Sequence, residues 1–383
     1  MDFSFTKEQE MWRETTRRFA SKELMPTAKE RAQRNEGFSR EFIKKYSEIG
    51  ALGLMVPAKY GGSESDNVSF GIGCEELSKA TISDGLLLTY PYFFCRALMI
   101  ASEELKEKWM PLIPPGDCLC APCNTEPHCG SDSVAIQTTA KKDGNHYIIN
   151  GQKSCISMAM VADVGIVFAK TDPSAGARGI TAFLVPFDSP GVTRTPIEMT
   201  GWKPQTEATI FFDNVHVPEE NIIGEEGKGF YMVMSQFDVM RACVALTALG
   251  TAQASLEMAI SYAKERTAFG KPIARFEGVS FKLAEDYTKI EAARLLCYRA
   301  LWLADQGLPH TKASAMAKLI SPIVAVNTIH NAMLIHGNVG YSTELYLEQR
   351  LRDAIGAEYG DGTAEIMKLI IIRELLGKEF LPY

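Results

Sequence analysis

The spacing of apolar residues changes twice along the chain and divides it into three parts. Between residue 6 and about residue 110, apolar residues recur every three or four positions, as they do in amphipathic helices. Thr6 and Gln9 have the spacing of a capping box, so the first helix is predicted to begin there. Further helices are expected over residues 39–51, 67–80, 85–101 and 103–112, with a break at VPAKYGG, residues 56–62.

After Pro114-Pro115-Gly116 the pattern becomes that of β-strands. Short runs rich in β-branched and aromatic residues are separated by glycine, proline and aspartate. They predict strands over residues 146–151, 164–170, 179–186 and 208–218. Asp143-Gly144 is a turn signal before the first of these. Several strands at such close spacing predict a compact β-barrel or sandwich.

Helical periodicity returns after GEEGKGF, residues 224–230. Long helices are predicted over residues 229–265, 277–306, 311–336 and 363–377, and Gly377 is a stop signal for the last. The order of helices, strands and helices predicts an α+β fold of three domains. We place them at 1–113 (an N-terminal α-helical domain), 114–225 (a middle β domain) and 226–383 (a C-terminal four-helix bundle).

Composition and charge exclude several functional classes. The net charge is −7 and Lys and Arg form no basic cluster, so nucleic acid binding is not expected. The apolar runs near 86–100 and 366–376 are short and contain Arg96 and Arg373, so no membrane span is expected. The start, MDFSFTKEQE, lacks the order of a secretory signal, and nine cysteines fit a reducing compartment. We therefore expect a cytoplasmic protein.

The stretch CLCAPCNTEPHCGSD, residues 118–132, combines four cysteines with a polar loop. Its cysteine spacing lacks the two separated pairs of a structural zinc site, and free cysteines often pack as small apolar residues. We expect Cys118 and Cys120 to lie on a strand and to face the same side, and we expect no metal. The polar half could turn backbone N–H groups toward a phosphate or a ring carbonyl, but an ordinary capped turn fits equally well.

Seven segments, taken in order, resemble the acyl-CoA dehydrogenase family of flavoproteins along essentially the whole chain. They are TEPHCGSD (125–132), KSCIS (153–157), residues 200–230, FDVMR (237–241), ERTAFGKPI (265–273), HGNVGYSTE (336–344) and RDAIGAEYGDGTAEI (352–366). The resemblance implies a homotetramer with one FAD per subunit, held between the β domain and the C-terminal helices. It also implies an acyl-CoA substrate and an electron-transfer flavoprotein as the electron acceptor.

The resemblance further implies a set of cofactor-binding residues. Thr125 would bind the flavin ring, Ile156 and Ser157 would lie along the ring, and Ser131 would touch both FAD and the pantetheine of CoA. The remaining residues implied to bind FAD within one subunit are Cys123, Asn124, Thr363 and Glu365. Those implied to reach the FAD of a neighbouring subunit are Arg266, Phe269, Glu277, Gly337 and Asn338. Read from the residues alone, Arg266 could be a surface residue, Phe269 a core residue and GEEGKGF a hairpin turn.

The reaction implied by the resemblance removes the α-proton of an acyl-CoA while the β-hydride passes to flavin N5, which gives an enoyl-CoA. Most of the family carries a glutamate base just before Gly-Thr, where this chain has Asp361. A second subgroup carries the base where this chain has Met240. Asp361 is therefore the predicted base, although Asp361-Gly362 could also be only a turn dipeptide.

The remaining substrate contacts are also implied by the resemblance. They are Ser131, Phe237, Asp238, Arg241, Tyr90 and Gly362. The helix LLLTYPYFFCRALMI, residues 86–100, carries bulky rings that favour a short cyclic or branched acyl group of the cyclohexanecarboxyl-CoA type. The same rings could instead face the core.

The chain departs from the family pattern at several positions near the expected flavin. Cys155 replaces a tryptophan, Leu334 and Asn338 replace a glutamine and a glycine, and Gln205-Thr206 replace Ser-Asp. These departures leave two alternatives open. One is atypical chemistry, either a shifted 1,4-type elimination on a cyclic enoyl-CoA or enoyl-CoA reduction. The other is a non-enzymatic scaffold that binds CoA or a metal.

Overall fold

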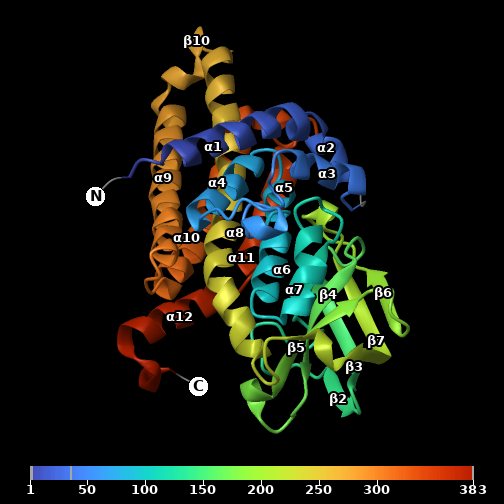
Figure 1. The fold of residues 1–383 in the computed structure, drawn as a ribbon. Helices are drawn as coiled ribbons and strands as arrows, with labels where there is room; N and C mark the ends of the chain where they lie inside the picture. The colour runs from blue at the N-terminus through green and yellow to red at the C-terminus, as the bar shows by residue number, and fades with distance from the viewer. Residues whose placement is uncertain (1–2, 35–36, 382–383) are drawn as a thin grey trace.

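The computed structural model of the protein describes residues 3–34 and 37–381. Helices occupy both ends of the chain and a β-sheet occupies the middle (Figure 1). This arrangement confirms the predicted order of the three parts. The boundaries that we placed after residues 113 and 225 remain predictions.

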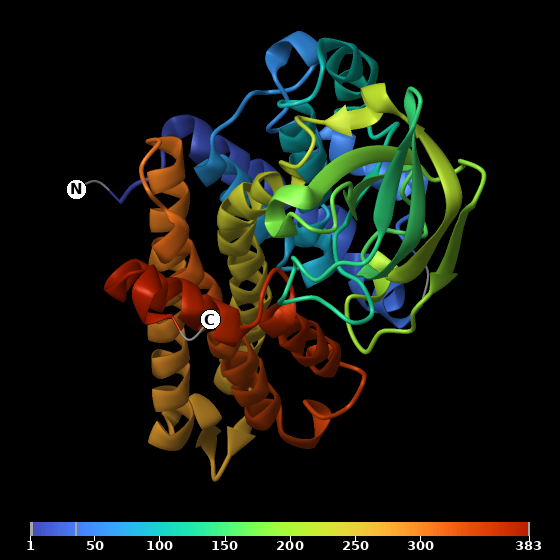
Figure 2. The ribbon, with the colours of Figure 1, turned by 90° about the horizontal axis from the view of Figure 1, so that it is seen from below.

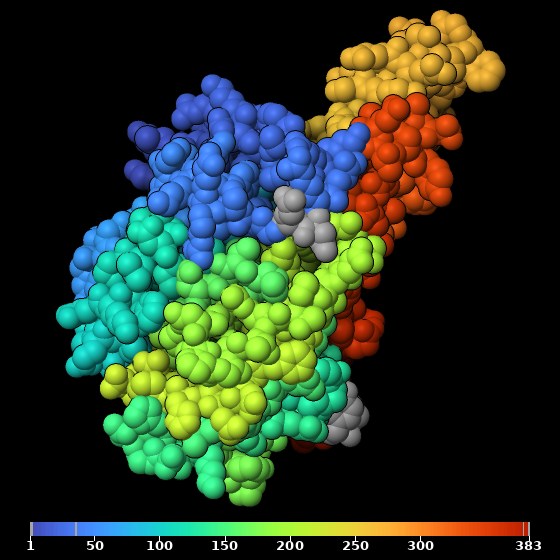
Figure 3. All heavy atoms as spheres, turned by 90° about the vertical axis from the view of Figure 1, so that its right-hand side faces the viewer, coloured from blue at the N-terminus to red at the C-terminus, as the bar shows by residue number. Residues whose placement is uncertain are grey.

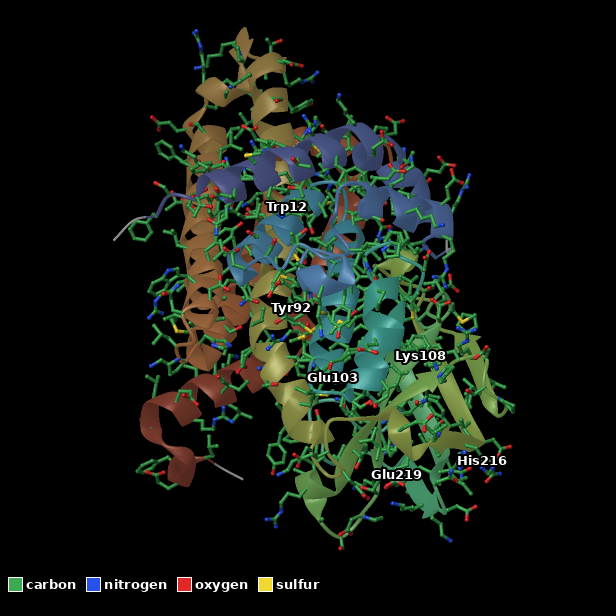
Figure 4. The ribbon with its side chains drawn as sticks, viewed as in Figure 1. Trp12, Tyr92, Glu103, Lys108, His216 and Glu219 are labelled. Carbon is green, nitrogen blue, oxygen red and sulfur yellow. The ribbon has the colours of Figure 1, made fainter. Side chains whose placement is uncertain are left out.

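The N-terminal part packs its first helix against a buried one. Its helices are α1 (Lys7–Phe19), a π-helical turn (Ala20–Leu24), α2 (Met25–Gln33), α3 (Arg40–Glu48), α4 (Asn67–Leu77), α5 (Ile82–Leu86), α6 (Thr89–Leu98) and α7 (Glu103–Trp109). The capping box of Thr6 and Gln9 is present. Trp12 lies between α1 and α4 (Figure 4), and its Nε1 donates to the carbonyl of Ser69 at 2.9 Å. The indole therefore fixes α1 on a core helix.

The middle part is one curved sheet (Figure 2). Its strands are β1 (Cys120–Cys123), β2 (Thr139–Asp143), β3 (His146–Ile156), β4 (Val164–Lys170), β5 (Ile180–Pro186), β6 (Val192–Pro196), β7 (Ala208–Pro218) and β8 (Ile222–Ile223). Their order is β6-β7-β3-β2-β4-β5-β8, and β1 pairs with β4. Gly144, with a φ of 61°, forms the predicted turn between β2 and β3. The antiparallel pairing of β3 and β7 brings Ile156 opposite Ala208.

The C-terminal part is built on three long helices. Its elements are α8 (Gly229–Glu265), β9 (Thr267–Ala268), β10 (Lys271–Pro272), α9 (Glu277–Asp305), α10 (Thr311–His336), α11 (Leu347–Tyr359) and α12 (Ala364–Leu376). Two helices, α8 and α10 with the turn after it, are long and apolar enough to cross a membrane by length and composition. The most apolar stretch of α8 is 78% buried inside the fold and that of α10 is 50% buried. Packing against α4, α9 and α11 accounts for much of this apolar character.

The structure differs from the predicted elements in a few places. The helix expected over 85–101 is two helices, α5 and α6, because a separate cap at Thr81 begins α5. We did not predict α11, whose start at Tyr346 has no side-chain cap to signal it. Cys118 is buried but precedes β1, so it is not a strand residue. The strand expected at the cysteines is β1, which begins at Cys120, whereas the short strands β2, β6 and β8 were not predicted individually.

Candidate functional site

The site predicted from the sequence lies where the loop between β6 and β7 meets α11 and the turn that follows it. Trp202 joins the two parts, because its backbone N–H donates to the carboxylate of Asp353 and its indole N–H to the Asp353 carbonyl, both at 2.8 Å. A Cβ atom added at Gly356 or Gly360 would lie 2.8 Å from the Trp202 ring. The two glycines therefore leave the space that the indole fills. We call this region, residues 155–158, 202–207 and 359–363, the junction.

Asp361 is held in the junction by its backbone rather than by its side chain. Its φ is 54°, in the left-handed region that residues with a side chain rarely adopt. Arg241 Nε donates to the Asp361 carbonyl at 3.1 Å, and Lys318 Nζ donates to the Gly362 carbonyl at 3.2 Å. Within residues 3–34 and 37–381 the Asp361 carboxylate itself makes no hydrogen bond. Two cations thus fix the loop and leave the carboxylate available.

Burial and the nearby positive charges have opposing effects on the pKa of Asp361. Burial raises the pKa of the Asp361 carboxyl, and the nearby Lys318 ammonium and Arg241 guanidinium act in the opposite direction. The net result is a raised pKa. Burial lowers the pKa of Lys318 to about 8, although the Asp361 carboxylate opposes this. Sequence reasoning did not identify Lys318, because its approach to Gly362 depends on how α10 packs.

Tyr90, Ser157 and Glu207 come together beside Asp361. Tyr90 lies on α6, Ser157 directly follows β3, and Glu207 directly precedes β7. The Ser157 hydroxyl donates to Glu207 Oε1 at 3.4 Å. Tyr90 adjoins Ser157, and burial raises its pKa, as do the charges of Glu207 and Asp361 to a smaller extent. Glu207 is a second carboxyl in the junction that the sequence analysis missed. Its only signal was the unusual tripeptide Gln205-Thr206-Glu207 before a strand.

A buried ion pair fixes the loop that carries Cys123, Asn124 and Thr125. Lys153 Nζ lies 2.8 Å from Glu126 Oε1 and donates to the Asn124 carbonyl at 3.1 Å. Glu126 also accepts the backbone N–H groups of residues 137 and 138 at 2.6 and 3.0 Å. The Ser154 N–H donates to the Thr125 carbonyl at 2.9 Å. The loop therefore lies against the end of β3, next to Ile156 and Ser157.

The cysteines of this stretch are free thiols. Burial raises the pKa of Cys118 and of Cys123 to about 12, so both are neutral. Among the described residues, Glu126, His128 and Cys129 offer ligand atoms within 4.8 Å of one another. Both oxygens of Glu126 already accept hydrogen bonds from Lys153 and from backbone N–H groups. The Glu126 carboxylate therefore already has hydrogen-bond partners on both of its oxygens.

Residues with a strained backbone are frequent in the junction. Non-glycine residues with a φ between 45° and 63° include Cys155, Met158, Trp202, Thr206 and Asp361. Such conformations persist at sites where the surrounding structure imposes them. Gln205 Oε1 and Thr206 Oγ1 are buried and have no hydrogen-bond partner in the part of the chain described. Gln205 lies against α5, where its Nε2 donates to the Ser83 carbonyl at 3.0 Å.

The start of α12 adds a site for an anion. Thr363 is its N-cap, and its hydroxyl accepts the Ile366 N–H at 3.4 Å. The N–H groups of the first turn of a helix have no partner within the helix and favour negative charge, such as that of a phosphate. Glu365 is exposed on this first turn. This helix start could therefore hold the phosphate of a cofactor.

The residues expected at the CoA edge lie on α8 and the loops near the junction. Arg241 is buried and pairs with Asp238 at 3.0 Å, and the Thr311 hydroxyl donates to Asp238 at 2.6 Å. Phe237 is half-buried beside the Arg241 guanidinium. Ser131 is exposed on the loop after β1. Arg241 thus contacts the loop of Asp361 on one side and Asp238 on the other.

A second group of predicted cofactor residues lies at the other end of the C-terminal helices (Figure 1). Arg266 and Phe269 belong to the β9–β10 hairpin, which projects from the body of the molecule (Figure 3). Phe269 is 95% exposed, which rules out a core role. Glu277 begins α9, and the exposed Gly337 and Asn338 follow α10. The rings of Tyr262 and His336 stack with their centroids 4.5 Å apart, so the ends of α8 and α10 lie side by side. One chain does not bring this group to the junction.

Comparison with known proteins shows matches along nearly the whole chain. Three family models match, for the acyl-CoA dehydrogenase N-terminal domain at residues 6–117, the middle domain at 121–215 and the C-terminal domain at 227–376. An acyl-CoA dehydrogenase of Bacillus subtilis is 40% identical over 97% of this chain and 99% of its own length. A 3-(aryl)acrylate reductase of Clostridium sporogenes is 37% identical over 97% of this chain and 99% of its own.

Solved structures agree in fold over the same extent. Butyryl-CoA dehydrogenase of Megasphaera elsdenii has a TM-score of 0.95 and 36% identity, covering 98% of this chain and 100% of that chain. A chain in a structure of the electron transferring flavoprotein of Acidaminococcus fermentans has a TM-score of 0.95 and 37% identity, with the same coverage. The family models and relatives together show that this chain belongs to the acyl-CoA dehydrogenase family of FAD-dependent oxidoreductases.

Proposed function

We propose that this protein oxidises a short cyclic or branched acyl-CoA to the enoyl-CoA and that Asp361 is the catalytic base. The observation that supports this most directly is the Asp361 carboxylate, which has no hydrogen-bond partner among the described residues while two cations hold its backbone. Its raised pKa suits a base that must accept a proton from carbon near neutral pH. The roles of the individual residues given below are part of this proposal.

The residues in and next to the junction have separate roles in the proposed reaction. Asp361 takes the α-proton of the thioester, and Arg241 and Lys318 keep its loop in place. Bound FAD would supply the acceptor for the hydride from the β-carbon. The residues that would hold FAD within the subunit are Cys123, Asn124, Thr125, Ser131, Ile156, Ser157, Thr363 and Glu365. The side chains that would hold CoA are Ser131, Phe237, Asp238 and Arg241, next to Gly362.

The aromatic residues of α6 support a short acyl group through a single ring. Tyr90 adjoins Ser157 and is within electrostatic range of Asp361. The neighbouring rings pack elsewhere: Tyr92 stacks on Phe70 at 4.6 Å, and Phe94 lies 6.4 Å from the Trp109 ring. Tyr90, unlike Tyr92 and Phe94, is therefore placed where it would limit the length of the acyl group. A cyclic or branched group fits this limit better than a long straight chain.

Assembly and partners follow from the surface. Arg266, Phe269, Glu277, Gly337 and Asn338 would complete the FAD site of a neighbouring copy, because one chain keeps them away from its own junction. We therefore propose a homotetramer, as the family resemblance implies, located in the cytoplasm. The similarity to a chain in an electron transferring flavoprotein structure supports such a flavoprotein as the electron acceptor.

The test is a substrate panel on the purified protein. We expect a yellow tetramer whose flavin absorbance is bleached anaerobically by cyclohexanecarboxyl-CoA or a branched short acyl-CoA faster than by octanoyl-CoA. The product is identified by mass. Bleaching only by long straight chains would contradict the proposed substrate, and a colourless protein would contradict the enzymatic function. The similarity to a 3-(aryl)acrylate reductase favours a second candidate, enoyl-CoA reduction, which the same preparation tests with a reduced dye as donor.

Lys318 should set the acidic limit of activity. Replacing Lys318 with methionine removes a positive charge that favours the ionised form of Asp361, so the pKa of Asp361 should rise further. Because the base must be ionised, the acidic limb of the plot of kcat/KM against pH should move to higher pH. The difference from the wild type should shrink above about pH 8, where Lys318 itself becomes neutral.

Lys312→Met is the matched control for this prediction. Lys312 lies on the same helix but is exposed, so its substitution should leave the acidic limb in place. A limb that does not move in Lys318→Met would show that the charge of Lys318 does not act on the base.

A further inference from the structure

Glu207 is a buried carboxyl beside which residues 3–34 and 37–381 place no cation. Its exposed fraction is 6%, and the side chains that face it are Ser157 from the end of β3, Tyr90 from α6 and Tyr359 from α11. Burial raises the pKa of Glu207, and the hydrogen bond from Ser157 opposes this only in part. A buried carboxyl that has no cation to pair with favours its neutral, protonated form.

The two carboxyls of the junction therefore differ in their surroundings. Asp361 lies near Lys318 and Arg241, whose charges favour its ionised form. Glu207 has no such neighbour among the described residues, and burial also raises the pKa of Tyr90 and of Tyr359, which keeps both neutral. Where two carboxyls share a site and differ in this way, one tends to act as the base and the other to remain protonated.

The protonation state of Glu207 sets the direction of its hydrogen bond with Ser157. A serine hydroxyl has a single hydrogen to donate and two lone pairs. An ionised Glu207 can only accept, so it takes the hydrogen of Ser157, and Ser157 then offers only lone pairs to a bound group. A protonated Glu207 donates to Ser157 Oγ instead and leaves the hydrogen of Ser157 free. The protonation of Glu207 thus decides whether Ser157 is a donor.

We propose that Glu207 is a positioning residue that keeps its own proton at neutral pH and thereby makes Ser157 a hydrogen-bond donor toward the bound flavin. This inference rests on the proposed function, because it requires FAD at Ser157. A ring nitrogen of oxidised flavin has a lone pair and needs such a donor. Ionisation of Glu207 at alkaline pH reverses the bond, and the flavin then loses one hydrogen bond.

The test follows the flavin spectrum rather than turnover alone. The oxidised holoenzyme is titrated between about pH 6 and pH 10, a range that covers a raised carboxyl pKa, as wild type, Glu207→Gln and Ser157→Ala. We expect the visible flavin band of the wild type to shift with the ionisation of one group. In Glu207→Gln the shift should be absent, because the amide donates through Nε2 at every pH. In Ser157→Ala it should also be absent, because the hydroxyl that reports on Glu207 is gone.

The rate of flavin reduction gives a second readout. In the wild type it should fall at alkaline pH by about three- to tenfold, the effect of one hydrogen bond, whereas in Glu207→Gln it should not depend on pH over that range. Glu198→Gln, the same change at an exposed position of the same segment, should behave as the wild type. A Glu207→Gln protein that titrates as the wild type does would overturn the inference, as would a shift that persists in Ser157→Ala.

The outcomes also separate this inference from the proposed function. The spectral titration needs bound FAD but no substrate, so it tests Glu207 even if none of the acyl-CoAs reduces the flavin. A protein that is reduced by acyl-CoA but shows no titration in the wild type would retain the proposed function and lose the role of Glu207. A protein that does not bind FAD would overturn both.

Discussion

Replacing Asp361 with asparagine should lower kcat for acyl-CoA oxidation by about 10²- to 10⁴-fold, the usual contribution of a general base. Asparagine has nearly the same size but cannot accept a proton from carbon. The backbone bonds from Arg241 and Lys318 do not involve the side chain of residue 361, so the loop should keep its shape. Acyl-CoA should still bind, and the loss should appear in the rate of anaerobic flavin bleaching measured by stopped flow.

Two controls make the result interpretable. Asp117→Asn, an exposed position in the segment before β1, should leave the rate unchanged. The FAD content and visible spectrum of Asp361→Asn should match those of the wild type, since no hydrogen bond of the carboxylate is lost within the described chain. If Asp361→Asn bleaches the flavin at the wild-type rate, Asp361 is only a turn residue and the base lies elsewhere.

Replacing Lys153 with methionine should destabilise the protein by about 3–5 kcal/mol, the cost of leaving one member of a buried ion pair without its partner. Glu126 would keep its two backbone N–H donors but would lose the Lys153 ammonium at 2.8 Å. The Asn124 carbonyl would lose its hydrogen bond at the same time. We therefore expect weaker retention of FAD and a lower midpoint of urea denaturation.

Lys142→Met is the matched control for Lys153. It makes the same substitution in the same sheet and removes an ion pair with Glu219 of similar length, 2.6 Å, but both side chains are about half exposed. Little change in stability is expected there, because water screens exposed pairs. The double variant Glu126→Gln/Lys153→Met should recover part of the loss, since no charge is then left buried. Equal urea midpoints for Lys153→Met and Lys142→Met would rule out the structural role of the buried pair.

Much of the fold followed from local features of the sequence. The limits of α8, α10 and α12 agree with the periodic runs to within a residue or two, because caps and stop residues such as Thr363 and Gly377 act over one helical turn. The turn at Gly144 also depends on neighbouring residues alone. By contrast, α11 begins without a side-chain cap, and the strands β2, β6 and β8 are too short to show a clear period.

Only those residues of the candidate site that belong to a local sequence motif could be predicted. Asp361 could be selected because its place before Gly362-Thr363 is a local pattern. Glu207 could not, because it meets Ser157 only through the pairing of β3 with β7, which brings Ile156 opposite Ala208. Lys318 was missed for the same reason, since 44 residues separate it from the carbonyl that it contacts.

The sequence by itself determined the order of the three parts, the limits of the long helices and the identity of the carboxyl at position 361. These depend on periodicity, caps and adjacent residues, which act over a few positions. Only the tertiary structure decided that Arg241, 120 residues away, holds Asp361 through its backbone carbonyl and that Glu207 is buried with no cation near it among the described residues. It also separated the predicted cofactor residues into groups at two ends of the molecule. Charge environment and distance depend on which segments pack together, and no short stretch of sequence contains that information.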